Sequence, residues 1–217
     1  MNRTIPLVIN DRESETRTPA RPLIVIPAEA RDPFSAVPAV PSVAPHECDL
    51  TRIAPGRPQA AGDVIVIKGR ILDADLRPVR HALMEVWNAN THGRYSHSGD
   101  ASSQAPLDPH FYGFGRVLTD DHGFYTLRTI KPGAYMARSD IGWWRPPHVH
   151  FSILGSGIRL VTQMYFPDEP LNTQDYIHMI IPELERSRVI AQVHDQHSFR
   201  FDIIVRGRYQ TPLETTV

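Results

Sequence analysis

Short hydrophobic runs separated by turn-forming residues occupy most of the chain after residue 62. Some runs are continuous and others alternate apolar with polar positions, and both patterns are typical of β-strands with one or two buried faces. Gly, Pro, Asn and Asp between the runs mark tight turns. The strands predicted in this way are 64–73, 82–88, 114–118, 124–130, the segment that begins at His148, 159–166 and 199–205. Short strands with regular turns predict an all-β sandwich.

Two segments in the last third of the chain have a helical pattern instead. They are 173–180 and 182–192, and Pro182 suits the first position of the second helix, where a proline loses no hydrogen bond. We therefore expect a few short helices beside the β-sandwich core.

Residues 1–62 are rich in proline and charge and have little periodicity. Within them, 23–26 fits a short strand, and 36–45 fits an extended conformation because prolines alternate with small apolar residues. Most of this segment lacks the apolar residues to bury a core by itself. We predict an N-terminal arm over 1–62, which lies over the domain or over a partner, and a β-sandwich domain over 63–217.

Charge and cysteine content narrow the class of protein. The chain has 217 residues, and its 23 Lys and Arg against 24 Asp and Glu leave no broad basic surface, so nucleic acid is not an expected partner. Cys48 is the one cysteine, which excludes an internal disulfide. The first residues lack a basic region followed by a long apolar run, and no stretch of the sequence has the length of a membrane span. We expect a soluble cytoplasmic protein without a membrane partner.

The strand that begins at His148 carries the candidate chemistry. Side chains alternate along a strand, so His148 and His150 point to one face while Val149 points to the core. Two imidazoles on one face of a strand are able to share a metal ion, and Pro146 and Pro147 place them at the mouth of the strand. Two histidines that merely pack side by side are the alternative.

Two tyrosines complete a possible constellation. Tyr95 follows the turn at Gly93, and Tyr135 follows the turn at Gly133, so both lie where a strand meets a loop. Their phenols are able to reach a common point near the histidines. Taken alone, each tyrosine is equally well explained as a packing residue with its hydroxyl in water.

These residues occur within motifs that resemble those of the intradiol ring-cleavage dioxygenases. The resemblance covers about residues 46–206, in order and at matching spacing, and its motifs are most similar to those of the iron-bearing β subunits of protocatechuate-cleaving members. The motifs lie at 85–90, 93–95, 129–135, 144–150 and 162–166.

The resemblance implies a site and an activity. By motif, Tyr95, Tyr135, His148 and His150 would hold a non-haem Fe(III), with Tyr135 and His148 in the axial positions. Hard anionic oxygen suits this ion better than thiolate does. The implied reaction is cleavage of a catechol by O2 between its hydroxyl-bearing carbons to a cis,cis-muconate, with Tyr135 as the base.

Two further residues are carried over in the same way. Arg145 matches the family's active-site arginine, whose charge would stabilise charge that develops on the ring, and Gln163 matches a glutamine that faces the iron. A surface salt bridge and a strand-edge hydrogen bond are their structural alternatives. Arg138, near Tyr135, is either a partner for an anionic substrate group or a solvated surface arginine.

Two departures from the pattern concern the substrate. Protocatechuate-cleaving relatives carry a tryptophan two residues after the second tyrosine, where this chain has Ala137, and a tyrosine in the arm, whereas no tyrosine precedes Tyr95 here. The expected substrate is protocatechuate or a close 4-substituted analogue. The resemblance also implies a hetero-oligomer with a homologous α subunit that lacks the ligands, and a homo-oligomer is the competing possibility.

Two readings from other classes remain. The segments 69–73 and 119–125 also resemble transthyretin-like β-sandwich modules, which only bind and need no metal. Such a module gives no reason for the two tyrosines and two histidines to occur together. A cupin-type Fe(II) or zinc enzyme is the other reading, but that family expects a glutamate shortly after His150, and 151–155 contains none.

Overall fold

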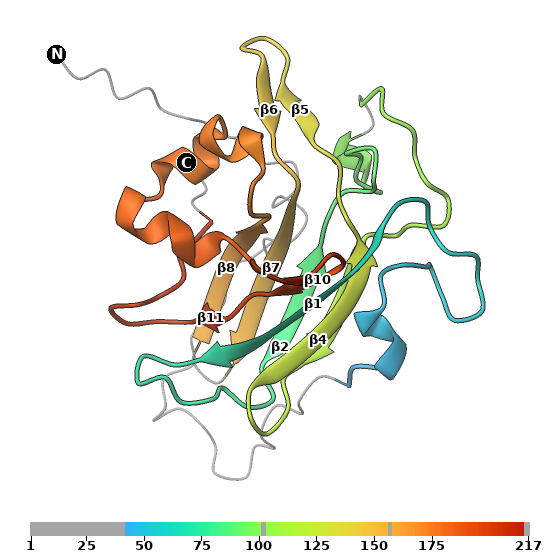
Figure 1. Cartoon of the computed structure of the whole chain (residues 1–217). Helices are drawn as coiled ribbons and strands as arrows, with labels where there is room; N and C mark the ends of the chain where they lie inside the picture. Colours follow the sequence, from blue (N-terminus) through green and yellow to red (C-terminus); the bar gives the residue numbers. More distant parts are fainter. Residues whose placement is uncertain (1–41, 101–102, 156–157, 215–217) are drawn as a thin grey trace, which may run out of the picture. The chain divides into compact units, whose positions relative to one another are not determined.

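The structure is a computed structural model, and it describes residues 42–100, 103–155 and 158–214. All the described helices and strands belong to one compact unit, Val43–Thr215 (Figure 1). No helix in these ranges is long and apolar enough to cross a membrane. The strand predicted at 23–26 and most of the extended segment at 36–45 lie outside the described residues.

The first sheet is organised around one long strand, β1. β4 pairs with β1 in antiparallel register, and β10 and β11 pair with successive parts of its other edge in parallel register. β9 extends the sheet by pairing with β10. The strands are β1 (Val64–Leu72), β4 (Phe124–Ile130), β9 (Gln192–Asp195), β10 (Ser198–Arg200) and β11 (Ile203–Ile204).

The second sheet is antiparallel throughout, in the order β3-β2-β7-β8, so β7 is an interior strand. A separate two-stranded ribbon pairs β5 with β6. The strands are β2 (Leu83–Trp87), β3 (Phe114–Leu118), β7 (His148–Gly155), β8 (Ile158–Tyr165), β5 (Tyr135–Arg138) and β6 (Trp143–Arg145).

A hydrophobic core lies between the two sheets, which face each other in Figure 1. Alternate residues of β1, such as Ile65 and Ile67, and of β7, such as Phe151 and Ile153, contribute to it and are at most 1% exposed. This is the packing of a β-sandwich, as the hydrophobic pattern predicted. The face of β7 that is turned away from this core carries His148 and His150, and it is also buried.

The helices are short, as expected, and most are 3-10 turns. They are η2 (Pro45–Cys48), η3 (Ser98–Asp100), η4 (Pro170–Thr173), α1 (Tyr176–Ile180) and η5 (Glu183–Val189).

Two predictions for the helical region were wrong in detail. The segment 173–180 is divided between η4 and α1, and the predicted helix 182–192 ends at Val189, because the chain then turns into β9. Pro182 is the N-cap of η5, with a ψ of 135°, and does not form its first turn.

The described part of the predicted arm packs on the sandwich. Leu50 and Ala60 are each 3% exposed and belong to the core, and Glu47 forms an ion pair with Arg116 of β3. Leu50 also donates a backbone hydrogen bond to Arg128 of β4. These contacts fix 42–62 against both sheets.

Candidate metal centre

β7 presents His148 and His150 on one face, as the alternation predicted. Val149 and Phe151 point into the core, while the two imidazoles lie on the opposite side and are 2% and 0% exposed. Their ring centroids are 4.8 Å apart. Because β7 is paired on both edges, the strand that carries the histidines is fixed in place.

The Nδ1 atoms of both histidines face groups that only accept. His148 Nδ1 lies 2.6 Å from the carbonyl oxygen of Pro146, and His150 Nδ1 lies 3.2 Å from a carboxylate oxygen of Glu214. Each Nδ1 therefore carries the proton, and each Nε2 keeps its lone pair. An acceptor that holds the far nitrogen of the ring in this way is the usual partner of a metal-binding histidine.

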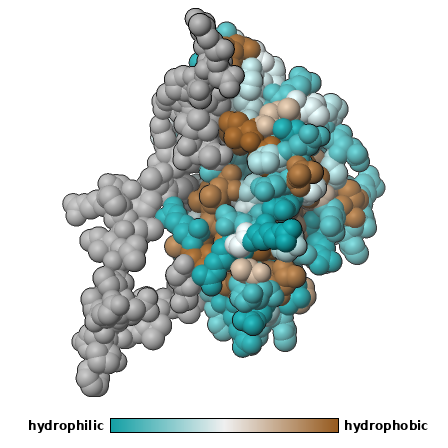
Figure 2. All heavy atoms as spheres, turned by 90° about the vertical axis from the view of Figure 1, so that its left-hand side faces the viewer, coloured by the Kyte–Doolittle hydropathy of each residue, from teal (hydrophilic) through white to brown (hydrophobic). Residues whose placement is uncertain are grey.

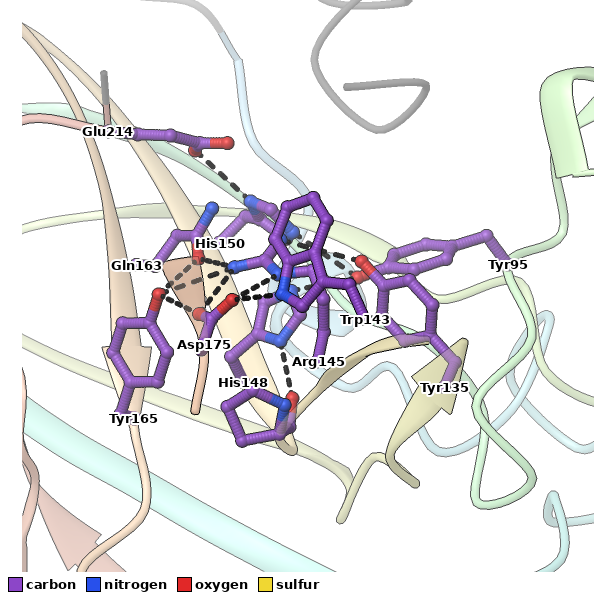
Figure 3. A network of polar contacts seen from close by, with 11 residues as sticks. Tyr95, Tyr135, Trp143, Arg145, His148, His150, Gln163, Tyr165, Asp175 and Glu214 are labelled. Carbon is purple, nitrogen blue, oxygen red and sulfur yellow. Dashed lines mark hydrogen bonds and ion pairs between the residues drawn. The ribbon is translucent and has the colours of Figure 1, made fainter. Parts of the chain in front are cut away.

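Tyr95 brings its hydroxyl to both lone pairs. Its Oη lies 3.4 Å from His148 Nε2 and 3.2 Å from His150 Nε2 (Figure 3). Each of these three buried atoms is able to give a lone pair to a cation. A metal cation at the point where they converge would be bound by all three.

Tyr95 and Tyr135 are brought together by two turns that pack against each other. Gly93, at φ +77°, is so close to the second turn that a Cβ there would lie 2.3 Å from the Ala134 oxygen. A Cβ on Gly133 would lie 2.4 Å from the Thr91 oxygen. Only glycine allows this approach of the two backbones. The two sequence motifs that contain the tyrosines are therefore one structural unit.

Buried asparagines join the same motifs. The Asn88 side chain donates to the Ile130 carbonyl and accepts from the Thr129 hydroxyl, and the Asn90 carbonyl accepts from Gly133 N at 2.9 Å. Asn88 and Asn90 are 1% and 2% exposed. These bonds hold the residues that follow β2 to the end of β4, upstream of the two turns that carry the tyrosines.

Tyr135 lies opposite Arg145 in the β5–β6 ribbon. Arg145 Nη1 donates to the Tyr135 hydroxyl at 3.4 Å, and the Tyr135 ring lies 5.8 Å from the ring of His148 and 5.7 Å from that of Tyr95. A guanidinium at this position would favour negative charge on the tyrosine oxygen. The structure thus brings together the four predicted ligand side chains, with Arg145 beside them (Figure 3).

Arg145 is held in a buried polar network, 2% exposed, and does not form a surface salt bridge. It donates to the carboxylate of Asp175 at 3.3 and 3.4 Å, to the Gln163 side-chain oxygen and to the Tyr165 hydroxyl. Asp175 also accepts from Trp143 Nε1 at 3.1 Å and from Tyr165 at 2.9 Å. The carboxylate neutralises the arginine and fixes its plane.

The ionisation of this network follows from burial and charge. Burial alone would raise the pKa of Asp175, but the charge of Arg145 and the hydrogen bonds from Arg145 and Tyr165 hold the pKa below its ordinary value, so the carboxylate is ionised. Burial raises the pKa of Tyr165 well above its ordinary value despite the nearby Arg145. Tyr165 therefore stays protonated and acts as a donor.

Gln163 is 3% exposed and pairs across the sheet with His150. Arg145 and Tyr165 both donate to its oxygen, which fixes the amide orientation and turns Nε2 away from them. That Nε2 is a buried donor with no hydrogen-bond partner among the described residues. A donor of this kind next to a candidate site is available to a ligand.

Several residues of the site could not be predicted from the sequence. Asp175 and Glu214 carry no local signal, since each reaches the site only through the fold, and Tyr165 lies within the motif at 162–166 without a predicted role. Trp87, which the motif at 85–90 contains, stacks on His150 with ring centroids 4.8 Å apart and a 4° angle between the rings. Arg138 forms a two-pronged ion pair with Asp140 at the surface, 2.7 and 2.8 Å, and so behaves as the solvated arginine of the two expectations.

The donor set itself decides which kind of metal fits. Among the described residues, no group of three His, Cys, Asp or Glu side chains is placed to hold a metal ion. The set at this centre is two imidazoles and two phenols, one of which faces a guanidinium. Phenolate oxygen is a hard, anionic ligand, which suits a highly charged ion such as Fe(III).

Comparisons with known proteins identify the family to which the chain is related. A family model described as Dioxygenase matches residues 36–207. The chain is 44% identical over 212 residues to the protocatechuate 3,4-dioxygenase beta chain of Burkholderia cepacia, across 94% of this chain and 90% of that one. It is 32% identical over 163 residues to the protocatechuate 3,4-dioxygenase alpha chain of Pseudomonas putida, across 71% and 77% of the two chains.

A solved structure supports the fold. The 3-chlorocatechol 1,2-dioxygenase of Rhodococcus opacus 1CP superimposes with a TM-score of 0.58 at 22% identity, across 79% of this chain and 68% of that one. At this identity the likeness concerns the fold alone.

Proposed function

The chain belongs to the intradiol ring-cleavage dioxygenases, and we propose that it cleaves protocatechuate or a close 4-substituted catechol with O2 at a non-haem Fe(III). Tyr95, Tyr135, His148 and His150 would hold the iron, and the product would be a cis,cis-muconate. The observation that carries the proposal is the convergence of the Tyr95 oxygen and two Nε2 lone pairs on one point, at 3.2 and 3.4 Å.

Fe(III) bound there would supply a Lewis acid that chelates a catecholate and draws electron density from its ring. The residues of the chain prepare that chemistry. Two imidazoles with protonated Nδ1 atoms are neutral, so the phenolates of Tyr95 and Tyr135 would provide the negative charge that a ferric ion requires. The low exposure of both histidines keeps bulk water away from the ligand atoms.

Tyr135 is the residue that would take a proton from the catechol. Its oxygen accepts from Arg145 at 3.4 Å, and a donated hydrogen bond from a cation lowers the cost of the phenolate form. Arg145 stays charged in the interior because its ion pair with Asp175 offsets the cost of burial, and the same ion pair fixes its position. The arginine is thereby also placed to stabilise negative charge that develops on the ring.

Gln163 would provide a directed hydrogen bond to an oxygen atom of the bound ligand. Its buried Nε2 has no partner among the described residues, and Arg145 prevents the amide from turning round, because a guanidinium is unable to accept. Because a buried donor without an acceptor is costly, the site would favour ligands that place an oxygen atom within reach of this Nε2.

The proposed substrate, protocatechuate or a close analogue, is taken from the name of the Burkholderia cepacia relative. Position 137 modifies this expectation. Ala137 occupies a β-bulge between Met136 and Arg138, where the β5–β6 register shifts. We propose that the small residue widens the pocket and gives broader tolerance at the 4-position of the ring. The test is kcat/KM for protocatechuate, 4-sulfocatechol, hydroxyquinol and catechol, repeated with Ala137→Trp. A strict preference for protocatechuate that Ala137→Trp leaves unchanged would refute this role.

We also propose that the chain assembles with a homologous α chain. Its relatives include both α and β chains of protocatechuate 3,4-dioxygenase, and its identity to the β chain is the higher of the two, 44% against 32%. Related chains that are named as the alpha and beta chains of one enzyme fit a hetero-oligomer. In such an assembly one of the two chains would hold the metal.

The decisive experiment is spectroscopic. Protein purified with iron should be red-brown, because a tyrosinate bound to Fe(III) gives a charge-transfer band in the visible range, and anaerobic addition of protocatechuate should shift that band. Admission of O2 should then yield the ring-opened carboxy-cis,cis-muconate, a tricarboxylate because protocatechuate already carries one carboxylate. A colourless protein with stoichiometric zinc, or no metal, would disprove the proposal and favour a binding module.

A further inference from the structure

Glu214 lies near the end of the chain but reaches the centre of the site. Its carboxylate is 2% exposed, and one oxygen lies 3.2 Å from His150 Nδ1, 64 residues away in the sequence. On the basis of the proposed function, we infer that Glu214 is a positioning residue that holds the His150 ring in its metal-binding orientation.

The backbone delivers this carboxylate in a fixed manner. The C-terminal segment, 211–214, is bonded at both ends: Thr211 exchanges two hydrogen bonds of 2.9 Å with Ile204 of β11, and Glu214 N donates to the Val161 carbonyl of β8 at 2.8 Å. Between them, the Thr162 hydroxyl donates to the Pro212 carbonyl at 2.7 Å. The segment is therefore bonded along the outer edge of β8, the strand that pairs with His150.

The stacking contact of His150 does not determine its orientation by itself. Trp87 lies parallel to the ring, 4.8 Å away, and this fixes the plane of the imidazole. A half-turn about the Cβ–Cγ bond leaves the ring in the same plane but exchanges Nδ1 with Cδ2 and Nε2 with Cε1. The stack is compatible with both orientations. Only one of them presents a lone pair to a metal, because the other places the carbon Cε1 where Nε2 would be.

Glu214 selects between these two orientations. Its carboxylate accepts from Nδ1–H in one orientation and meets a carbon in the other, and a buried carboxylate without its donor is costly. The selected orientation presents Nε2 to Tyr95 Oη at 3.2 Å. The negative charge also makes Nε2 a more basic ligand.

His148 needs no such residue. Its Nδ1 is bonded at 2.6 Å to the Pro146 carbonyl, two residues earlier on the same segment of backbone. The two histidines therefore differ in a way that substitutions are able to reveal: the orientation of His148 is local, and that of His150 depends on the C-terminal segment.

The test compares Glu214→Ala and Glu214→Gln with Leu213→Ala, a change in the same segment at a side chain that is 51% exposed. Each protein is loaded with Fe(III), and three quantities are measured: the rate of iron loss to a chelator, the position of the charge-transfer band, and the Tm of the iron-free protein. We expect Glu214→Ala to bind iron about 10- to 100-fold more weakly, with a shifted band. Glu214→Gln should bind more tightly than Glu214→Ala, because its amide oxygen still accepts from Nδ1–H.

The outcomes separate the inference from the proposed function. Wild-type iron affinity and an unchanged band in Glu214→Ala would overturn the inference alone. Equal losses of affinity and Tm in Glu214→Ala and Leu213→Ala would also overturn it, since Glu214 would then only anchor the segment. A wild-type protein that binds no Fe(III) would overturn the proposed function, and the inference with it.

Discussion

At the scale of single residues, the polar side chains of the site are held by groups whose protonation follows from their partners. Pro146 and Glu214 accept from the histidines, and Asp175 is ionised because the charge of Arg145 and the hydrogen bonds from Arg145 and Tyr165 outweigh the effect of burial on its pKa. Removal of one member of the buried Arg145–Asp175 pair would leave an uncompensated charge, which costs about 3–5 kcal/mol. The pair therefore positions Arg145, and substitution of either member is expected to destabilise the fold.

Tyr135→Phe is expected to separate iron binding from turnover. The change removes the oxygen that Arg145 stabilises at 3.4 Å, but it leaves Tyr95 and both histidines in place. Iron content should stay close to that of the wild type, while kcat falls by about 10²–10⁴-fold, the usual contribution of a general base. Tyr95→Phe, which removes the oxygen shared by both Nε2 atoms, should instead lose iron. Full activity of Tyr135→Phe would contradict its role as a base.

His178 is expected to make stability depend on pH. It is 6% exposed and packs on Tyr165 at 4.9 Å, and burial lowers its pKa below the ordinary 6.5, although Asn172 and Asp175 oppose the shift. The unfolded chain therefore binds a proton more readily than the folded one, so this contribution to stability is present above pH 6.5 and is lost as the pH falls below it. His178→Phe keeps an aromatic ring without a titratable group.

The measurement is Tm between about pH 7 and pH 5, a range that spans the ordinary histidine pKa. It compares the wild type, His178→Phe and the control His194→Gln, whose side chain is exposed on β9. The decrease of Tm with acidity should be smaller in His178→Phe than in the other two proteins. Identical decreases in all three would show that His178 is not responsible.

At the scale of elements, the site depends on turns more than on strands. Gly93 at φ +77° touches the turn before Tyr135, whereas Gly142 has a similar φ of +65° with nothing within 4 Å of the point where a Cβ would lie. Alanine at either glycine suffers the strain of a left-handed backbone, about 1–3 kcal/mol. Only at Gly93 would it also push two tyrosine-bearing turns apart.

Gly93→Ala and Gly142→Ala therefore form a matched pair. Both should lower Tm, but only Gly93→Ala should lose iron and the visible charge-transfer band, because its Cβ would lie 2.3 Å from Ala134 O and 2.9 Å from Tyr135 Cβ. Tm by calorimetry and iron per chain are the measurements. Retention of full iron by Gly93→Ala would show that the contact between the turns does not position the ligands.

The elements that the sequence predicted best are those with an unbroken pattern. The bounds of β3 and β4 agree with the hydrophobic runs at 114–118 and 124–130. The run 199–205 divides into β10 and β11 because the Asp202 side chain, not a backbone carbonyl, accepts from Arg70 N. β5 and β6 were missed, since they have four and three residues and a bulge interrupts them.

At the scale of the whole molecule, what the sequence predicted and what it missed have a common explanation. The motifs that predicted the tyrosines and histidines are local, and their spacing is readable along the chain. Asp175 and Glu214 approach the site from segments 30 residues after Arg145 and 64 residues after His150, and only the tertiary fold brings them there. Periodicity carries no information about such contacts.

The surface of the molecule bears on its assembly. Figure 2 shows a mainly hydrophilic face with separate hydrophobic patches. On α1 and η5, four apolar or aromatic side chains are strongly exposed, and Leu184 is the extreme case at 92%. The other three, at 42–46%, are Tyr176, Met179 and Ile180. Exposed apolar groups that lie close together are more often part of a contact surface than of a surface that stays in solvent.

The last prediction is that this surface meets the homologous α chain of the proposed hetero-oligomer. Leu184→Glu would place a charge in an apolar contact, so co-expression with the α chain should give a smaller assembly by light scattering and a lower yield of the complex. Leu107→Glu, at a leucine that is 55% exposed outside this surface, is the control and should assemble as the wild type does. Iron content should be unchanged in both variants, because neither residue touches the site. A fully active assembly of this chain alone would contradict the heteromeric arrangement, and wild-type assembly of Leu184→Glu would place the contact elsewhere.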